Sequence, residues 1–199
     1  GRFFSINLQQ ATQQLSKRGP DFLNTSLHNR VNLGHTRLSI IDPNPESHQP
    51  MTDPTERYTI VFNGEIYNYR EIRQKLQNQG VEFTTASDTE VVLQAYIHQG
   101  VECLASFDGF FALGIYDKEA NTLLLARDRF GIKPLLIYQD EDKLFFGSEM
   151  KALVRFGIEK EIDYVSLKTY LQLNDVPQPY SMLKKVRKLA VGHYLLIKG

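Results

Sequence analysis

The sequence predicts an α+β domain built from antiparallel sheets. Amphipathic helical patterns occupy the start and the middle of the chain, whereas a run of hairpin-linked strands fills the second half. This segregation differs from the regular strand–helix alternation that produces parallel sheets. A length of 199 residues, with 42% apolar and 23% charged residues, is typical of one sizeable globular domain.

The first element is a helix over residues 4–16, where apolar side chains recur every three or four positions. Gly19 and Pro20 follow it as stop signals. Residues 30–42 are mostly apolar and are interrupted by a glycine, which favours one or two strands. The prolines in residues 43–50 then predict an irregular loop.

Residues 58–62 form the next predicted strand, because they are rich in β-branched and aromatic side chains. Asn63 and Gly64 follow, and this pair predicts a bend because both residues tolerate positive φ. A helix is expected after the bend, since Asn68 and Glu71 have the spacing of a capping box.

A second capping pattern, Ser87 with Glu90, begins another helix, which Gly100 ends. The remaining elements are predicted as hairpin-linked strands, a short helix, a longer helix and a last strand, over residues 109–117, 122–128, 135–149, 149–157, 164 onward and 192–198.

Composition argues against several classes of function. Lys+Arg 23 and Asp+Glu 23 cancel, and no basic stripe is concentrated anywhere, so we expect no nucleic-acid partner. No apolar run approaches the length of a membrane span, so we expect no membrane partner. The lone Cys103 cannot form an internal disulfide and suits a reducing cytoplasm, where we expect it to be a buried, inert thiol. The five histidines are scattered, so no metal site is expected.

The chain carries no phosphate-binding glycine loop, HExxH, paired CxxC or GxSxG motif. Its most informative polar positions are Asn63, Gly64, Arg37 and Asp88. At the end of a strand, the Asn63 amide and the Gly64 N–H can converge on one point as an oxyanion hole. The alternative is an ordinary turn.

Arg37 lies inside the apolar run GHTRLSII, so it must find a carboxylate or keep a route to water. It could grip a substrate carboxylate, or it could form a structural ion pair. If Ser87 caps its helix, Asp88 is a spare carboxylate that could bind an amine; alternatively, Asp88 caps the helix or complements its dipole. Together these groups suit a zwitterion and describe hydrolysis or transfer at the side-chain carbonyl of an amino acid.

Six motifs occur in a fixed order: RGPD (18–21), GHTRLSIID (34–42), NGEIYN (63–68), SDTEV (87–91), RDRFGIKPL (127–135) and SEMKAL (148–153). Together they closely resemble the N-terminal glutaminase domain of glutamine-hydrolysing asparagine synthetases. These are class II glutamine amidotransferases with the N-terminal-nucleophile hydrolase fold.

The resemblance implies a single amidotransferase domain over residues 1–199, folded as a four-layer α/β/β/α sandwich of two antiparallel sheets. It implies that glutamine places its carboxylate on Arg37 and its amine near Asp88, and that Asn63 and Gly64 form the oxyanion hole. The pocket would be lined by Leu38, Ser39, Ile40, Ile41, Asn63, Gly64 and Glu65. The motif at residues 127–135 would be a structural loop near the site or near the exit for ammonia.

One departure concerns the nucleophile. In the family it is an N-terminal cysteine in a Cys-Gly-Ile strand, with the α-amino group as base, whereas this sequence begins with Gly1. Cys103 cannot replace it, because it has no adjacent terminal amine. We expect that an N-terminal segment is omitted, the alternative being a catalytically inactive relative.

The resemblance implies glutamine and a C-terminal synthetase domain as partners, admits a homodimer, and assigns no cofactor to this domain. ATP and Mg would belong to the synthetase domain, which lies outside these residues. Two alternatives remain: an amidotransferase with another acceptor, in a sugar, cell-wall or antibiotic pathway, and a non-catalytic glutamine-binding or interaction module.

Overall fold

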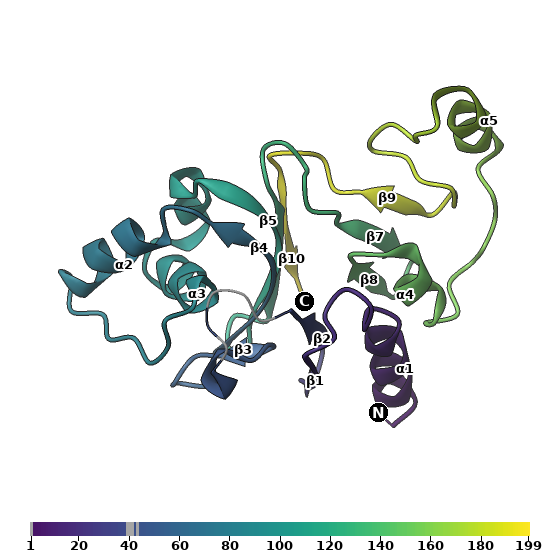
Figure 1. The fold of residues 1–199 in the computed structure, drawn as a ribbon. Helices are drawn as coiled ribbons and strands as arrows, with labels where there is room; N and C mark the ends of the chain where they lie inside the picture. Colours follow the sequence, from purple (N-terminus) through teal and green to yellow (C-terminus); the bar gives the residue numbers. More distant parts are fainter. Residues whose placement is uncertain (1, 39–41, 43) are drawn as a thin grey trace.

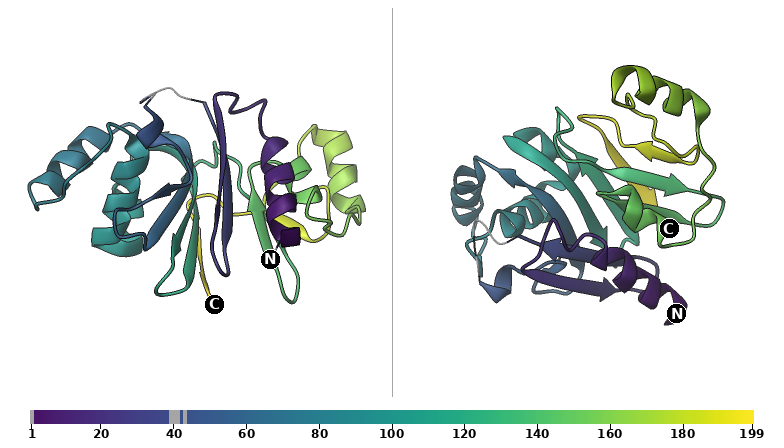
Figure 2. Two further views of the ribbon diagram at one scale, coloured as in Figure 1. Left: turned by 90° about the horizontal axis from the view of Figure 1, so that it is seen from below. Right: turned by 45° about the vertical axis from the view of Figure 1, so that its right-hand side comes forward.

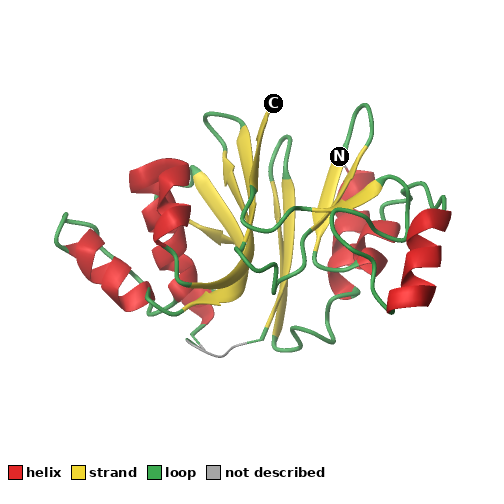
Figure 3. Ribbon diagram, turned by 90° about the horizontal axis from the view of Figure 1, so that it is seen from above, coloured by secondary structure: helices red, strands yellow, loops and turns green. Residues whose placement is uncertain are grey.

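Two β layers lie face to face, with helices on both outer sides (Figure 1). The views from below and from above show the same order, helix, strand, strand, helix, across the molecule (Figure 2, Figure 3). This computed structural model describes residues 2–38, 42 and 44–199. The α/β/β/α architecture is therefore confirmed.

The first β layer is a five-stranded sheet in the order β10-β6-β5-β4-β3. All its pairings are antiparallel. Its strands are β3 (Met51–Thr52), β4 (Tyr58–Ile66), β5 (Gly109–Asp117), β6 (Thr122–Arg127) and β10 (Tyr194–Lys198). Helices α2 (Tyr69–Gln77) and α3 (Asp88–Gln99) and the 3-10 helix η2 (Gly100–Ser106) belong to the helical layer beside it.

The second β layer has two separate parts among the described residues. One is the hairpin of β1 (Phe22–Leu27) and β2 (Asn32–Arg37), and the other is a three-stranded sheet in the order β8-β7-β9. The latter contains β7 (Leu136–Gln139), β8 (Leu144–Gly147) and β9 (Val186–Lys188). Helices α1 (Arg2–Gln13), α4 (Met150–Val154) and α5 (Tyr164–Leu173) lie on its outer side, and η1 (Pro45–Ser47) lies in the loop after β2.

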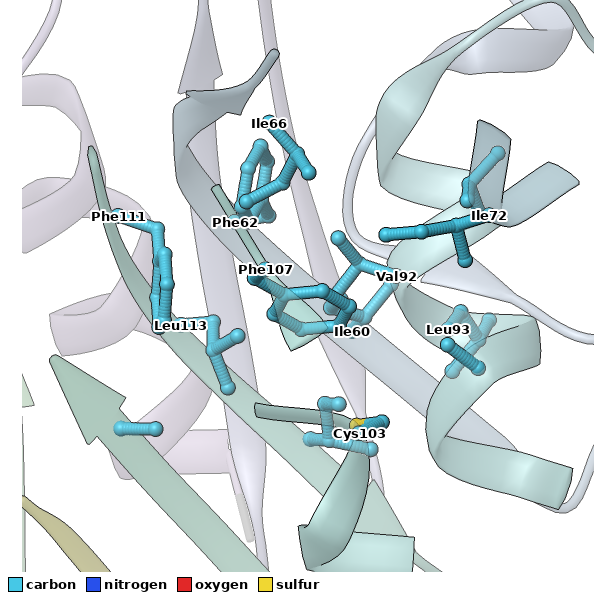
Figure 4. Close-up of a cluster of buried hydrophobic side chains, with 14 of the residues drawn as sticks. Ile60, Phe62, Ile66, Ile72, Val92, Leu93, Cys103, Phe107, Phe111 and Leu113 are labelled. Carbon is cyan, nitrogen blue, oxygen red and sulfur yellow. The ribbon is translucent and has the colours of Figure 1, made fainter. Parts of the chain in front are cut away.

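The period-2 alternation of β4 divides its side chains between two cores. Ile60, Phe62 and Ile66 point into the cluster beneath α2 and α3, which Figure 4 shows in close-up. Val61 belongs to the cluster between the β layers. Cys103 is in the helical-side core, which confirms that it is buried, and burial raises the pKa of its thiol to about 12, as expected for an unreactive cysteine.

The predicted bend at Asn63 and Gly64 is wrong. Both residues lie inside β4, where Asn63 is opposite Ala112 and Gly64 is opposite Phe111 of β5. A Cβ atom at Gly64 would stand 2.2 Å from the carbonyl oxygen of Phe110. The glycine is therefore required by the close approach of the neighbouring strand, and not by positive φ.

The two capping predictions had different outcomes. Ser87 Oγ accepts a hydrogen bond from Thr89 N–H at 3.0 Å, which confirms Ser87 as the cap of α3. The reciprocal half of that capping box is wrong, because the Glu90 carboxylate accepts from Thr84 and Thr85 and not from the Ser87 N–H. Asn68 precedes α2 without a side-chain cap, so that prediction is wrong. Its amide instead bridges the η2–β5 connection, donating to Ser106 O at 2.9 Å and accepting from Asp108 N–H at 3.0 Å.

Candidate functional site

A cavity of about 1610 Å³ lies between the two β layers and reaches the start of α3. It is lined by six of the residues that the sequence singled out: Arg37, Leu38, Asn63, Gly64, Glu65 and Asp88. The predicted lining residues Ser39, Ile40 and Ile41 lie outside the described residues. The groups predicted to bind a zwitterion therefore open onto one space rather than onto separate surfaces.

Strand pairing determines where the Gly64 N–H points. Phe111, opposite Gly64, uses both of its backbone polar groups on Asp128: its N–H donates to Oδ2 at 3.3 Å and its carbonyl accepts from the Asp128 N–H at 2.8 Å. Opposite residues in an antiparallel pair alternate between exchanging both hydrogen bonds and exchanging none. Gly64 and Phe111 are of the second kind, so the Gly64 N–H points away from β5, at the edge that borders the cavity.

The Asn63 side chain faces the second β layer, on the same side of β4 as Val61. Its Nδ2 donates to Ser148 Oγ, just after β8, over a long 3.4 Å. A hydrogen bond of this length is weak, so the amide can exchange Ser148 for a ligand at little cost.

Arg37 ends β2 and is buried. Its guanidinium donates to two loop carbonyls, through Nη1 to Asn44 O at 3.1 Å and through Nη2 to Asp42 O. Arg37 forms none of the salt bridges among the described residues. The alternative of a structural ion pair is therefore not found in that part of the chain. A guanidinium has five N–H donors, and these two bonds to described residues use two of them.

Asp88 is the first residue of α3 and is only 5% exposed. Its Oδ2 accepts from the Ile66 N–H at 3.2 Å, which ties the helix to the edge of β4. Burial raises the pKa of Asp88 to about 6, and the nearby Glu65 carboxylate adds to the rise. Ser87 caps the helix, so Asp88 does not, and an ammonium group would offset its desolvation.

Sequence reasoning missed two polar side chains that border the same cavity, Gln49 and His35. Gln49 Oε1 accepts from the Phe62 N–H at 2.6 Å, and His35 Nε2 contacts the Phe62 carbonyl at 3.1 Å. His35 stands two residues before Arg37 in the same apolar run, a signal that could have found it. Gln49 lies in a proline-rich loop, where nothing local marks it.

Two further features of the described residues bear on partners. They contain no group of three or more His, Cys, Asp or Glu side chains arranged to hold a metal ion. Within the same part of the chain, no helix has both the length and the apolar character needed to cross a membrane.

Known proteins resemble the chain along nearly its whole length. The first asparagine synthetase (glutamine-hydrolyzing) of Bacillus subtilis strain 168 is 39% identical over 191 residues, which is 96% of this chain and 30% of that protein. A putative asparagine synthetase (glutamine-hydrolyzing) of Mycobacterium bovis is 38% identical over 96% of this chain and 31% of its own length. The amidase chry2 of Gibberella zeae is 34% identical over 96% of this chain and 28% of its own length. The chain thus spans about 30% of the length of these relatives.

Solved structures with a similar fold include the glutamine phosphoribosylpyrophosphate amidotransferase of Bacillus subtilis, complexed with ADP and GMP. Its TM-score is 0.55 at 27% identity, over 63% of this chain and 29% of that one. An allosteric regulatory enzyme of purine biosynthesis has a TM-score of 0.62 over 84% of this chain and 33% of that one. Its sequence is 23% identical, so this similarity supports the fold alone. The profile of the glutamine amidotransferase domain matches residues 5–199. The chain therefore belongs to the glutamine amidotransferase domain family.

Proposed function

We propose that this domain binds glutamine in the cavity between the β layers and hydrolyses its side-chain amide to glutamate and ammonia. In the whole protein, the ammonia would amidate aspartate in asparagine biosynthesis. The observation that carries the proposal is that Arg37, Asp88 and the Gly64 N–H border one cavity. These three groups are complementary to a carboxylate, an amine and a developing oxyanion.

Arg37 and Asp88 would hold the two charged ends of the amino acid. The remaining donors of Arg37 suit the α-carboxylate, because a guanidinium binds a carboxylate through parallel hydrogen bonds. Asp88, ionised above a pKa of about 6, suits the α-ammonium. With both ends fixed, the side-chain amide of glutamine would extend along the edge of β4.

The Gly64 N–H and the Asn63 amide would stabilise the tetrahedral intermediate. Each donor aimed at a developing oxyanion contributes roughly a hundredfold or more in rate. The resemblance assigns the nucleophile to an N-terminal cysteine, and we propose that a segment ahead of Gly1 supplies it. Its α-amine would take the thiol proton as the S–C bond forms and give it to the departing ammonia, and water would then cleave the thioester.

The same proposal covers the rest of the protein. The relatives are about three times as long as the match, since the chain spans about 30% of them, and we infer a C-terminal synthetase domain that uses ATP and Mg. No cofactor is assigned to the glutaminase domain. A cytoplasmic location is consistent with a single buried cysteine, and a homodimer is compatible with the proposal.

A second candidate keeps glutamine hydrolysis but changes the acceptor. It is favoured by the similarity to amidase chry2, which is 34% identical over 96% of this chain. The acceptor would be selected by residues outside the glutaminase domain, so the two candidates share the site described here.

The test is a glutaminase assay on the chain extended ahead of Gly1 by a strand that begins Cys-Gly-Ile. Glutamate release is expected, and the matched protein beginning Ala-Gly-Ile should release none. Arg37→Ala and Asp88→Ala should lower kcat/KM at least a hundredfold. Full activity in either variant would refute the site assignment. Calorimetry that detects neither glutamine binding nor hydrolysis in the extended chain would favour a non-catalytic interaction module.

A further inference from the structure

The edge of β4 that faces the cavity is covered in an unusual way. β3 pairs with β4 only at Thr59 and Ile60. Beyond these residues, side chains from other elements take the backbone groups of Phe62 and the N–H of Ile66. Gly64 lies between these two residues, and no described side chain takes its N–H.

Gln49 joins two parts of the site through one carboxamide. Its Oε1 accepts from the Phe62 N–H at 2.6 Å, and its Nε2 donates to Thr89 Oγ1 at 3.2 Å. The side chain is only 5% exposed, so neither bond competes strongly with water. Phe62 stands two residues before Gly64 and Thr89 directly follows Asp88. Gln49 therefore links the strand that carries the oxyanion donor to the helix that carries the amine-binding carboxylate.

His35 holds the other polar group of Phe62. Its Nε2 lies 3.1 Å from the Phe62 carbonyl, so this nitrogen carries the proton and donates. Burial lowers the pKa of His35 to about 4, which keeps the ring neutral near pH 7. Its buried Nδ1 then has no partner among the described atoms. A buried acceptor without a partner is unfavourable, so the contact with Phe62 is kept at some expense of stability.

We propose that Gln49 is a positioning residue for glutamine hydrolysis. By binding the Phe62 N–H it holds the Gly64 N–H at a fixed place relative to Asp88, and His35 supports Phe62 through its carbonyl group. The inference rests on the proposed function. Gln49 need not touch glutamine, because it acts through Phe62 and Thr89.

The physical basis is the short range over which an oxyanion donor works. Such a donor stabilises the transition state when it lies about 2.7–3.1 Å from the developing charge, and a displacement of about 1 Å can lower the rate on the order of a hundredfold. Without Gln49, the Phe62 N–H loses its acceptor at this edge, and the segment from Phe62 to Gly64 can shift relative to α3. The loss should appear mainly in kcat, because Arg37 and Asp88 still hold the ends of the substrate.

Asp53 provides a matched control on the same strand. Its Oδ1 accepts from the Tyr58 N–H at 2.6 Å, the same length as the Gln49 bond, and it is 6% exposed. It lies at the opposite end of β4 and does not line the cavity between the β layers. Loss of Asp53 therefore removes a hydrogen bond of the same length from β4, together with the bonds of its Oδ2 to Thr55, without acting on Gly64.

The experiment compares Gln49→Met with Asp53→Leu in the cysteine-initiated protein. Gln49→Met should lower kcat for glutamine hydrolysis ten- to a hundredfold with KM within about threefold, whereas Asp53→Leu should keep kcat within twofold. Equal effects of the two variants on kcat would overturn the proposal. If Gln49→Met does not fold, Thr89→Val replaces it, because it removes only the acceptor of Gln49 Nε2 and should lower kcat at least threefold.

A second measurement is independent of catalysis. The ¹H–¹⁵N resonance of Gly64 is recorded in the 199-residue chain, where Gln49→Met should move or broaden it and Asp53→Leu should not. An unchanged Gly64 resonance in Gln49→Met would refute the positioning role even if kcat falls. Absence of glutamate release from the unsubstituted cysteine-initiated protein would refute the proposed function, and the resonance would still decide the role of Gln49.

Discussion

At the scale of single residues, the site contains a carboxylate whose ionised form is destabilised by its surroundings. Asp88 is buried beside Glu65, and both effects raise the pKa of Asp88 to about 6. Because the folded-state pKa exceeds that of the unfolded chain, the folded protein binds more protons between about pH 4 and pH 6. Its stability therefore decreases as pH rises through this range. An ammonium group bound to Asp88 would stabilise the ionised carboxylate and so offset this loss of stability.

Asp88→Asn should stabilise the protein and abolish glutamine binding. The rise of the pKa from its ordinary value to about 6 corresponds to at most about 3 kcal/mol of unfolding free energy at pH 7. The amide oxygen of asparagine can still accept from the Ile66 N–H. Urea unfolding should show a gain of about 1 to 3 kcal/mol at pH 7 that disappears below pH 4. A loss of stability at pH 7, or a gain that is the same at both pH values, would contradict this account of Asp88.

Gly64→Ala should destabilise the fold through the neighbouring strand. The added Cβ would lie 2.2 Å from Phe110 O and 2.7 Å from Phe111 Cα, which are backbone atoms that cannot move alone. The expected loss is roughly 3 kcal/mol or more, measured by thermal or urea unfolding. Gly80→Ala is the comparison, since a Cβ there meets nothing within 4 Å but must adopt a φ of +88°. It should cost only about 1 kcal/mol. Equal losses would mean that close strand approach is not what requires Gly64.

At the scale of elements, the loop after β6 is held by a buried carboxylate. Asp128 is 1% exposed and accepts hydrogen bonds from the N–H groups of Phe130, Ile132 and Lys133 at 2.9 to 3.2 Å. It also accepts from Phe111 N–H, so the loop is fixed to β5 beside the site. The interpretation of residues 127–135 as a structural loop agrees with these bonds, although Phe130 is 80% exposed.

Asp128→Ala should cost roughly 3 kcal/mol or more, because it leaves several backbone N–H groups without an acceptor. Phe130→Ser, two residues away on the same loop, should change stability by less than about 0.5 kcal/mol, since the ring is exposed. Paired urea titrations would measure both. A large loss from Phe130→Ser would show that the loop is held by apolar packing and not by Asp128.

At the scale of the whole molecule, the ordered motifs and hydrophobic periodicity predicted the layers, the helices α2 and α3, and the residues that meet in the cavity. Local turn chemistry misled at Asn63-Gly64, because the need for glycine there comes from Phe110 on a distant strand. It also misled at Asn68, whose partners lie near residue 107. Strand β1 was not predicted, since its half-buried face becomes visible only once β2 pairs with it. Gln49 was not predicted either, because its hydrogen-bond partners are 13 and 40 residues away in the sequence.

The most direct test of the central claim is a crystal structure of the chain extended by an Ala-Gly-Ile strand and soaked with L-glutamine. We expect the α-carboxylate on the Arg37 guanidinium, the α-amine on the Asp88 carboxylate, and the side-chain carbonyl oxygen within about 3 Å of the Gly64 N–H. Glutamine bound elsewhere, or bound here with its amide turned away from β4, would contradict it.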